Sequence, residues 1–539
     1  MNKIEEIKRE RDGLDVREAI ARYAATGWES ISEDDIQRLK WYGLFLRNPT
    51  PGYFMIRVRM PGGRTNAQQL RVLADIASAY GNGLLDLTTR QQMQLRQIRI
   101  EDVPAVFSKM ESAGLTSLQT GMDNVRNIMT CPVAGSNPDE LLDATPIIAR
   151  LTQILTADRK YSNLPRKFNI AVTGCLDNCL HTETQDLALV PASVIRDDVK
   201  IAGFNVHAGG KLGSGGYRIA GPLNIFVTAP EAVEVCRAII DIFRDYGPRD
   251  SRTTSRLAFL LDDWGEARFR DAVEHRLGWT LATAGVDARR AAVKDHIGLY
   301  RQKQGGLNYV GLKIRVGRIA AADLMEMAAL AERYGTGEVR LSPAQTMILM
   351  NVPDRRVGDL TEESLVKRFT YNPSPIQKGL VSCVGNDYCN LAVIETKSRA
   401  VQVAKALESR LGSDLRPITM HWSGCPAGCG NHAVADIGLL GKKVKIKGQI
   451  VEAADVYVGG RSGPDPKPAV KLLEDVPCDK LASVLEGILP YHTREKMHRS
   501  RGTKASKKME TPLGRGRAQD ERAQSVVPDE RAASLPVVR

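Results

Sequence analysis

The chain has 539 residues, which is too many for one hydrophobic core, so we expect several domains. Apolar residues make up 43% of it and charged residues 26%. The sequence contains no run of about 18 apolar residues, the length needed to cross a bilayer. The formal net charge of +12 does not by itself indicate nucleic-acid binding, because no helix-turn-helix, zinc-finger or aromatic RNA-binding signature accompanies it. An acidic partner or a polycarboxylate cofactor fits the charge equally well.

The N-terminal segment, residues 1–47, is expected to be helical. It opens with MNKIEEIKRE, which carries acidic residues and lacks the apolar stretch of a secretory signal, so we expect a cytoplasmic protein. In that reducing compartment, clustered cysteines among the nine are better interpreted as metal ligands than as disulfides.

A strand–helix–strand pattern follows. We expect a strand at Tyr53–Met60, a helix at Ala67–Tyr80 and two extended segments at Leu84–Thr88 and Met93–Ile100. Gly81 stands where a left-handed glycine would end the helix. The pattern predicts a small α+β sandwich.

The same pattern recurs in the second half of the chain. YFMIRVR at Tyr53–Arg59 resembles YVGLKIR at Tyr309–Arg315, and Ala79–Leu95 aligns without gaps to Arg333–Leu349. A repeat of about 250 residues is too long for a solenoid unit, so it indicates a gene duplication with two related halves around a pseudo-two-fold axis. Asp263–His296, charged and helical in pattern, would connect the halves.

Four cysteines in the second half form the main candidate metal site. Cys383 and Cys389 make a C-x5-C pair, and Cys425 and Cys429 make a C-x3-C pair about 35 residues later. Four thiolates match the four irons of a cubane cluster, each of which takes one external ligand. Structural zinc is the alternative, but zinc sites favour C-x2-C spacing, so the pattern favours iron–sulfur.

The first half carries its own cysteines at equivalent places. TGCLDNC, with Cys175 and Cys179, aligns to the second C-x3-C motif, and Cys131 lies in IMTCPVAG. One interpretation is a second cluster or redox site. The other is a remnant of the duplication with three buried thiols, which we favour because a cubane normally needs four ligands.

The C-terminal tail is strongly basic. Residues 494–539 hold 12 Lys/Arg against 6 Asp/Glu, which is about half of the excess positive charge. With few large apolar residues, the tail is expected to be disordered.

The cysteine segments resemble those of a known family. GLVSCVGNDYCNLAVIETK and MHWSGCPAGCGNHAVADIGLLG look like the cluster motif of siroheme-dependent nitrite and sulfite reductases. The likeness runs from about Trp41 to about Ile488 and is most similar to the ferredoxin-dependent assimilatory nitrite reductases. Its further landmarks are Leu87–Arg96, Leu115–Asn127, Asn163–Val172 and Gly203–Gly210.

The resemblance implies two cofactors, a [4Fe–4S] cluster and siroheme. The cluster ligands would be Cys383, Cys389, Cys425 and Cys429, and Cys429 would also bind the siroheme iron. Siroheme carries eight carboxylates, so its pocket needs many cations and amide donors. The resemblance places such residues near the macrocycle or its distal face: Arg90, Gln94, Arg96, Arg126, Arg166 and Lys167.

The implied substrate-binding set is Arg57, Arg126, Lys167 and Asn169. The three cations would hold the nitrite anion and stabilise charge that develops on oxygen, and Arg126 and Lys167 are the candidate proton donors. Sulfite reductases of the family usually have lysine where this chain has Asn169. Because sulfite is dianionic near neutral pH and nitrite monoanionic, one fewer cation favours nitrite.

The resemblance also implies the fold: an α+β, internally duplicated nitrite/sulfite reductase fold with two ferredoxin-like half-domains and two larger α/β siroheme/cluster domains. The expected segments are the N-terminal helical segment 1–47, half-domain 48–112, siroheme-binding domain 113–275, connector and half-domain 276–362, 4Fe–4S/siroheme domain 363–493, and tail 494–539.

The expected reaction is the six-electron reduction of nitrite to ammonium. No flavin or nicotinamide domain is visible, so the electrons would come from another protein, reduced ferredoxin or a flavodoxin. We expect a monomer that binds neither nucleic acid nor membrane. The alternatives are an assimilatory sulfite reductase, a cobalamin-pathway oxygenase and a non-enzymatic iron–sulfur or zinc protein.

Overall fold

The computed structural model describes residues 2–213, 215–291, 293–411 and 415–489. The chain divides into two compact units, Met1–Glu486 and Gly487–Arg539, and the description that follows concerns the first. The tail for which disorder was expected lies outside the described residues.

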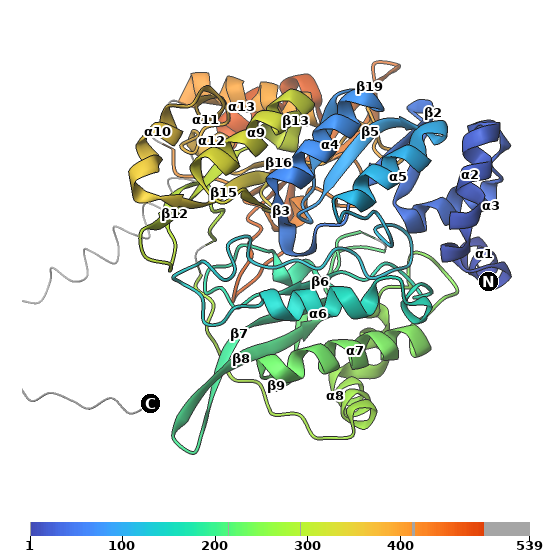
Figure 1. The fold of residues 1–539 in the computed structure, drawn as a ribbon, viewed down its shortest axis with the longest axis vertical. Helices are drawn as coiled ribbons and strands as arrows, with labels where there is room; N and C mark the ends of the chain where they lie inside the picture. The colour runs from blue at the N-terminus through green and yellow to red at the C-terminus, as the bar shows by residue number, and fades with distance from the viewer. Residues whose placement is uncertain (1, 214, 292, 412–414, 490–539) are drawn as a thin grey trace, which may run out of the picture. The chain divides into compact units, whose positions relative to one another are not determined.

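Three helices form the N-terminal segment: α1 (Lys3–Glu10), α2 (Arg17–Thr26) and α3 (Glu33–Arg38). Ser32 caps α3 by accepting from the backbone N–H of Asp35. Ile20 and Tyr23 of α2 are buried in the large core that the two half-domains share. The segment is therefore packed against the body through apolar contacts (Figure 1).

The first half-domain is built on an antiparallel sheet. Its strands are β1 (Leu44–Arg47), β2 (Thr50–Arg57), β5 (Met93–Arg99), β4 (Leu84–Leu87) and β13 (Arg318–Ala320), in that order. Helices α4 (Ala67–Ala79) and α5 (Val103–Ser112) pack on it. The apolar positions of α4, among them Leu70, Leu73 and Ala77, are buried because they recur on one helix face.

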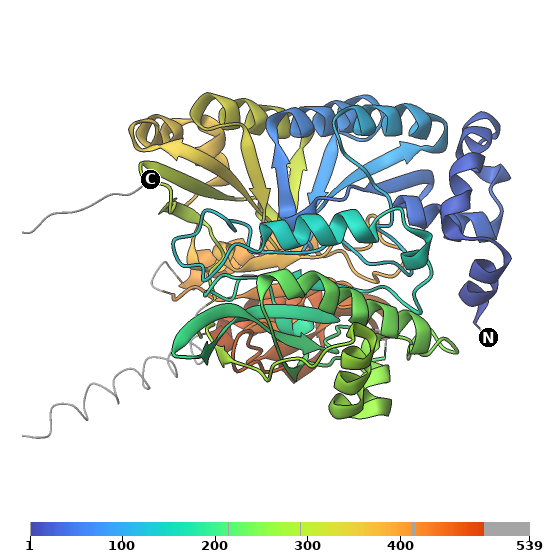
Figure 2. The same ribbon diagram turned by 60° about the horizontal axis from the view of Figure 1, so that its bottom comes forward.

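The second half-domain repeats this arrangement. Its sheet has the order β11 (Gly298–Arg301), β12 (Leu307–Lys313), β15 (Thr346–Pro353), β14 (Glu338–Leu341) and β3 (Arg64–Asn66). Helices α9 (Ala321–Tyr334), α10 (Val357–Glu362) and α11 (Ser364–Phe369) accompany it. Figure 2 shows the helices of both half-domains as one layer above the two sheets.

Each half-domain lends one short strand to the other. β3, from the first half, pairs with β14, and β13, from the second half, pairs with β4. The two sheets are thus joined by reciprocal exchange, and buried residues of both halves form one core that includes Leu70 and Leu324. The predicted duplication is confirmed as a pseudo-symmetric, interlocked pair.

The larger α/β layers repeat as well. One sheet comprises β10 (Val286–Asp287), β7 (Leu187–Arg196), β8 (Val199–Ala208) and β9 (Gly221–Val227), with β6 (Ile170–Val172) paired parallel to β7. Its helices are α6 (Thr145–Leu155), α7 (Ala229–Tyr246) and α8 (Leu257–Leu277). The other sheet runs β16 (Leu380–Ser382), β17 (Met420–Ser423), β18 (Ile437–Ile446), β19 (Gln449–Val458) and β20 (Val470–Pro477), with helices α12 (Pro375–Lys378) and α13 (Lys397–Leu411).

Two local expectations need correction. Gly81 directly follows Tyr80, the C-cap of α4, as expected, but its backbone is not left-handed. Glycine is required there because an added Cβ would lie 2.6 Å from the Arg96 carbonyl oxygen. The connector is helical only as far as Leu277, where α8 ends at left-handed Gly278. Beyond it, up to Ile297, β10 is the only strand or helix among the described residues. The expected α+β fold is confirmed.

Candidate active site

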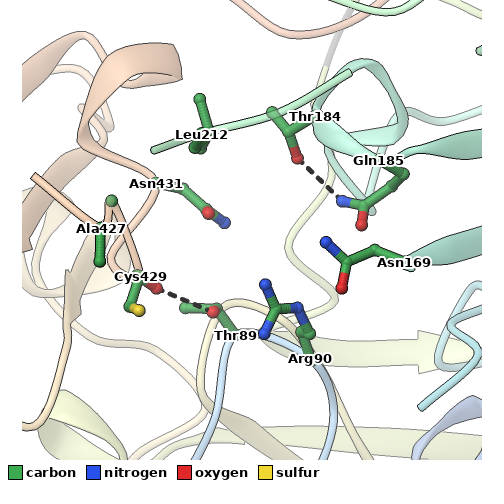
Figure 3. Close-up of a pocket in the computed structure, with 10 residues that line it drawn as sticks. Thr89, Arg90, Asn169, Thr184, Gln185, Leu212, Ala427, Cys429 and Asn431 are labelled. Carbon is green, nitrogen blue, oxygen red and sulfur yellow. Dashed lines mark hydrogen bonds between the residues drawn. The ribbon is translucent and has the colours of Figure 1, made fainter. Parts of the chain in front are cut away.

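A cavity opens where segments from both halves of the chain meet. It encloses about 420 Å³, counting the part open to solvent. Figure 3 shows Arg90, Asn169 and Asn431 pointing into it from different sides. The lining residues are Thr89, Arg90, Asn169, Thr184, Gln185, Leu212, Ala427, Gly428, Cys429 and Asn431. Cys429, the predicted shared ligand, therefore forms part of the wall.

The turn between β4 and β5 presents Arg90 to this cavity. Thr88 accepts, through its hydroxyl, from the backbone N–H groups of Arg90 and Gln92, and Asn127 donates to the Arg90 carbonyl at 3.0 Å. The neighbouring Thr89 hydroxyl donates to the Cys429 carbonyl at 3.0 Å. The turn is thereby fixed to the cysteine loop of the other half.

The cysteine loops follow the carboxyl ends of the parallel strands β16 and β17. β16 and β17 are parallel, and Ser382 pairs with Trp422 at their carboxyl ends, so Cys383 and Cys425 follow side by side. The N–H of Cys383 donates to the Trp422 carbonyl at 3.0 Å, and the N–H of Gly424 donates to the Cys383 sulfur at 3.1 Å. Backbone pairing therefore brings the two cysteine pairs together.

The thiol pKa values show that the four cysteines share one neighbourhood. Burial raises the pKa of Cys383, and Cys429 raises it further. Burial also raises the pKa of Cys425 to about 12, and Cys429, Cys389 and Cys383 add to this rise. A metal centre that binds Cys383 and Cys425 must therefore displace their protons.

Two predicted cations share one backbone acceptor. Arg57, at the end of β2, donates from Nη1 to the Thr120 carbonyl at 3.1 Å, and Arg126 donates to the same oxygen at 2.9 Å. Arg126 also donates to the Met122 carbonyl, from Nη2 at 2.8 Å and from Nε at 3.2 Å. Thr120 thus holds the two guanidinium groups next to each other.

No carboxylate pairs with Arg57, Arg90, Arg126 or Lys167 in the part of the chain that the structure describes. Burial lowers the pKa of Arg57 to about 9, with Arg90 adding to the effect and Cys429 opposing it. Burial lowers the pKa of Lys167 well below its usual value, and Arg90 and Arg256 lower it further. An anion placed among these cations would be strongly stabilised.

Asn169 lies just before β6 and is 4% exposed. Its N–H donates to the Asp186 carboxylate at 2.8 Å, which fixes the backbone. Its side-chain oxygen is buried and has no partner among the described residues. This side chain offers polarity without charge to the cavity that it lines.

Three predicted cofactor-binding residues, Gln94, Arg96 and Arg166, contact residues that do not line the cavity. Arg96 donates from Nε to Asp86 at 2.7 Å and from Nη2 to Gln94 at 2.6 Å, and it lies 5.2 Å from the ring centre of Tyr388. Arg166 lies 3.8 Å from Asp123. Arg96 and Gln94 thus support the C-x5-C loop, which contains Tyr388. Their cofactor-binding roles stay predictions.

Sequence reasoning missed Arg256. Its guanidinium makes two hydrogen bonds of 2.7 Å with Asp186, the residue that holds Asn169, and it contributes to the lowered pKa of Lys167. Its partner Asp186 stands at the position of Asp436 in the sequence repeat. No sequence motif pointed to its arginine partner.

Comparison with known proteins defines the class. The family model described as the nitrite and sulphite reductase 4Fe–4S domain matches residues 121–281 and 378–509. The nitrite/sulfite reductase ferredoxin-like half domain matches residues 47–113 and 300–365. The chain therefore belongs to the nitrite and sulfite reductase family.

Particular relatives are similar over most of their length. The chain is 46% identical to the ferredoxin–nitrite reductase of Synechococcus elongatus over 497 residues, covering 91% of this chain and 96% of that protein. It is 42% identical to the chloroplastic ferredoxin–nitrite reductase of Zea mays over 473 residues, covering 85% and 82%. The solved Mycobacterium tuberculosis NirA protein superposes with a TM-score of 0.84 at 31% identity, covering 90% of this chain and 92% of that one.

Proposed function

We propose that this chain is an assimilatory ferredoxin–nitrite reductase. It converts nitrite, six electrons and eight protons into ammonium and two waters. The observation that carries the proposal is the cavity beside Cys429, around which buried and half-buried cations lie without carboxylate partners in the described chain. The similarity to ferredoxin–nitrite reductases over 91% of the chain supports the same reaction.

The residues present fit the two cofactors of the family. The four thiols from the ends of β16 and β17 would hold the [4Fe–4S] cluster, with Cys429 shared with siroheme at the cavity wall. The unbalanced charges of Arg90 and its neighbours suit a macrocycle with eight carboxylates, since arginine donates two hydrogen bonds to one carboxylate. When bound, siroheme supplies the iron on which nitrite is reduced.

We assign nitrite binding to Arg57, Arg126 and Lys167. The backbone carbonyls of Thr120 and Met122 orient Arg126, so it is held ready for an anion rather than drawn away by a carboxylate. Preorganised donors of this kind stabilise charge that develops on oxygen at no reorganisation cost. Asn169 contributes a neutral amide, which matches the single charge of nitrite.

Lys167 is the assigned proton donor. Burial and the nearby Arg90 and Arg256 lower its pKa, so its ammonium group gives up a proton more readily than an exposed lysine would. Arrival of an anion opposes this effect and promotes uptake of the next proton. The residue can therefore cycle between its two protonation states during turnover.

Reduced ferredoxin is the proposed electron donor, as the names of the relatives indicate. The net charge of +12 suits association with an acidic protein of this kind. Among the described residues, no helix is long and apolar enough to span a bilayer. A cytoplasmic location and a monomeric state are further parts of the proposal.

Steady-state kinetics with reduced ferredoxin test the proposal. The purified holoenzyme should have a much higher kcat/KM for nitrite than for sulfite. Arg57→Gln should lower kcat/KM for nitrite by roughly 100-fold, the size typical of losing one preorganised donor. Arg99→Gln, on an exposed side chain at the end of β5, is the matched control and should leave it unchanged. Equal rates for Arg57→Gln and the wild type would contradict the assignment.

A further inference from the structure

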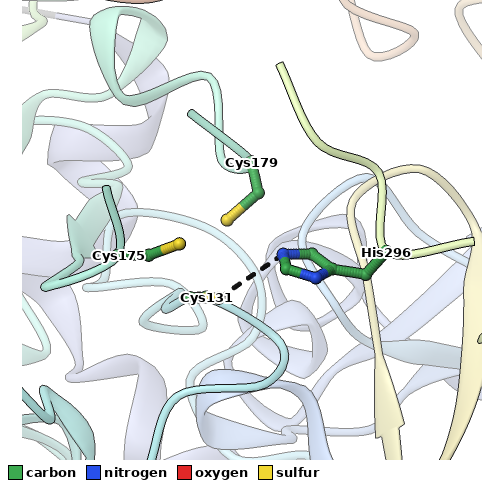
Figure 4. A group of neighbouring side chains, drawn as sticks. All are labelled: Cys131, Cys175, Cys179 and His296. Carbon is green, nitrogen blue, oxygen red and sulfur yellow. Dashed lines mark hydrogen bonds between the residues drawn. The ribbon is translucent and has the colours of Figure 1, made fainter. Parts of the chain in front are cut away.

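A compact group of metal-binding side chains lies in the first half of the chain, apart from the cavity. The ligand atoms of Cys131, Cys175, Cys179 and His296 all lie within 4.8 Å of one another. Within the described ranges, no other group of three or more such side chains brings its ligand atoms this close together. Figure 4 shows the side chains of Cys175, Cys179 and His296 converging, with His296 linked to Cys131.

The ligands come from three separate parts of the chain. Cys175 and Cys179 lie in the loop that follows β6, Cys131 lies in the loop that precedes α6, and His296 stands two residues before β11. Cys131, Cys175 and His296 are at most 1% exposed, and Cys179 is partly buried. Such burial excludes water as a competing ligand and indicates a closed site.

The site is the pseudo-symmetric counterpart of the cluster site. Gln91 donates to the carbonyl of Thr130, directly before Cys131, and accepts from the N–H of Thr130. The aligned Gln345 makes the same two hydrogen bonds with Ser382, directly before Cys383. The duplication thus kept the backbone support of the ligand loop while the ligand set itself diverged.

His296 replaces the missing fourth cysteine. Its Nε2 lies 3.6 Å from the Cys131 sulfur, and its Nδ1 lies 3.1 Å from the Tyr309 hydroxyl on β12. When Nε2 binds an ion, Nδ1 carries the proton and can donate to Tyr309, which would fix the orientation of the ring. The backbone of His296 is left-handed, with φ +58°, a strained conformation for a non-glycine residue that the surrounding fold maintains.

Neighbouring side chains fix the loops of the site. Asn137 donates from Nδ2 to the Cys175 sulfur at 3.0 Å. Arg340, 3% exposed, donates to the carbonyls of Pro132 and Ala134, both of which follow Cys131, and pairs with Glu338 at 2.8 Å. The loop that carries Cys131 is thereby held in place by a buried arginine whose charge is balanced.

We propose that Cys131, Cys175, Cys179 and His296 bind a single structural zinc ion. Zinc prefers four sulfur and nitrogen ligands in a tetrahedron, and bonds of about 2.3 Å to sulfur and 2.0–2.1 Å to nitrogen place those ligands about 3.6 Å apart. The observed distance of 3.6 Å between Cys131 and His296 matches this spacing. A cubane cluster would hold its ligands farther apart, because each binds a different iron.

The ion would fasten the end of the connector to the first half of the fold. Residues 278–297 contain only β10 as a described helix or strand, so few backbone hydrogen bonds hold this stretch. Zinc would tie its end, at His296, to loops of the first α/β layer. The site has four protein ligands and leaves no open position, so its role is structural rather than catalytic. The inference does not depend on the proposed reaction.

Metal analysis and zinc K-edge X-ray absorption of the purified holoenzyme test the proposal. We expect one zinc per chain in addition to iron, surrounded by three sulfurs at about 2.3 Å and one nitrogen at about 2.0–2.1 Å. The measurement is element-specific, so the iron cofactors do not interfere. Absence of zinc, or zinc bound only by nitrogen and oxygen, would overturn the proposal.

Matched variants connect the ion to these ligands. Cys175→Ser should lose the zinc and keep its iron, whereas Cys236→Ser, at an equally buried cysteine in α7, should keep both. His296→Cys should retain zinc and change its shell to four sulfurs. The assignment would be overturned if Cys175→Ser retained all of its zinc. It would also be overturned if the wild type held no zinc and Cys175→Ser lost iron. If Cys175→Ser does not fold, the wild-type absorption spectrum and the His296→Cys shell decide the question.

Discussion

Asn169 is the residue at which nitrite and sulfite chemistry should diverge. It is buried beside several cations, yet its own side chain is neutral and its oxygen has no partner in the described chain. A lysine there would add one charge in a cavity that already holds Arg90. A further cation favours the dianion over the monoanion.

We therefore predict that Asn169→Lys shifts the ratio of kcat/KM for nitrite to that for sulfite toward sulfite by about tenfold, the effect of roughly 1.4 kcal/mol. Steady-state assays of both anions with one donor measure this ratio. The isosteric Asn169→Asp serves as a control of opposite charge and should weaken binding of both anions. An unchanged ratio in Asn169→Lys would mean that the neutral amide is not the reason for nitrite preference.

The lowered pKa of Lys167 leads us to predict that kcat depends on pH. Its pKa in the fold is lowered by burial and by Arg90 and Arg256, and catalysis requires the protonated form, so activity should fall as pH rises through that lowered pKa. Lys167→Arg keeps the charge at all these pH values. The alkaline limb of kcat should then move to higher pH, although kcat itself is expected to fall. If kcat fell at the same alkaline pH in the wild type and in Lys167→Arg, another group would be the proton donor.

Some site residues could be predicted from sequence and others could not. Arg57, Arg126 and Lys167 stand in continuous motifs that resemble the family. Arg256 is 70 residues from Asp186, its partner, and His296 is 165 residues from Cys131. Only tertiary folding brings such residues together, and a single histidine or arginine carries no local signal.

At the scale of elements, two equivalent glutamines hold the two ligand loops. Gln345 donates to the Leu87 carbonyl as well as to Ser382, and Gln91 donates to the Leu341 carbonyl as well as to Thr130. Each glutamine thus bridges the other half-domain and one cysteine loop. Both are buried and have positive φ, so they form a matched pair for mutation.

Gln345→Ala should lower the iron content per chain, because it removes the two buried hydrogen bonds to Ser382, directly before Cys383, and a third to Leu87, each worth about 1 kcal/mol. Gln91→Ala makes the same change in the first half and should lower zinc content while sparing iron. Metal analysis of the two variants measures both effects. Equal iron loss in the two variants would show a general loss of folding rather than a local one.

The helices and longer strands were predictable, while the exchange of β3 and β13 was not. Apolar periodicity indicated α4, β4 and β5 within a few residues of their ends. The exchanged strands are three residues each, too short for any periodic pattern, and their pairing depends on the other half of the chain. Gly81 looked like a helix terminator, but close approach of the Arg96 backbone explains it.

At the scale of the whole molecule, the two halves carry different sets of candidate metal ligands at equivalent places. The second half keeps four cysteines on loops after parallel strands, and the first half keeps three cysteines and gains His296. One site would serve electron transfer and the other would stabilise the connector. The sequence repeat placed Cys131, Cys175 and Cys179 at equivalent positions but favoured a remnant without a metal, because it gave no signal for His296 as a fourth ligand.

Electron delivery should depend on ionic strength. A chain of net charge +12 attracts an acidic ferredoxin, and salt screens that attraction. We predict that kcat/KM for ferredoxin falls at least tenfold between about 0.05 and 0.5 M salt, whereas turnover with a small artificial reductant changes little. A ferredoxin rate that is independent of salt would contradict electrostatic docking.

The stoichiometry of the complete reaction tests the central claim most directly. The purified protein is supplied with reduced ferredoxin and a limiting amount of nitrite, and the electrons consumed and the ammonium formed are both counted. The account predicts six electrons and one ammonium for each nitrite. Release of nitric oxide with fewer electrons, or reduction of sulfite but not of nitrite under the same conditions, would contradict it.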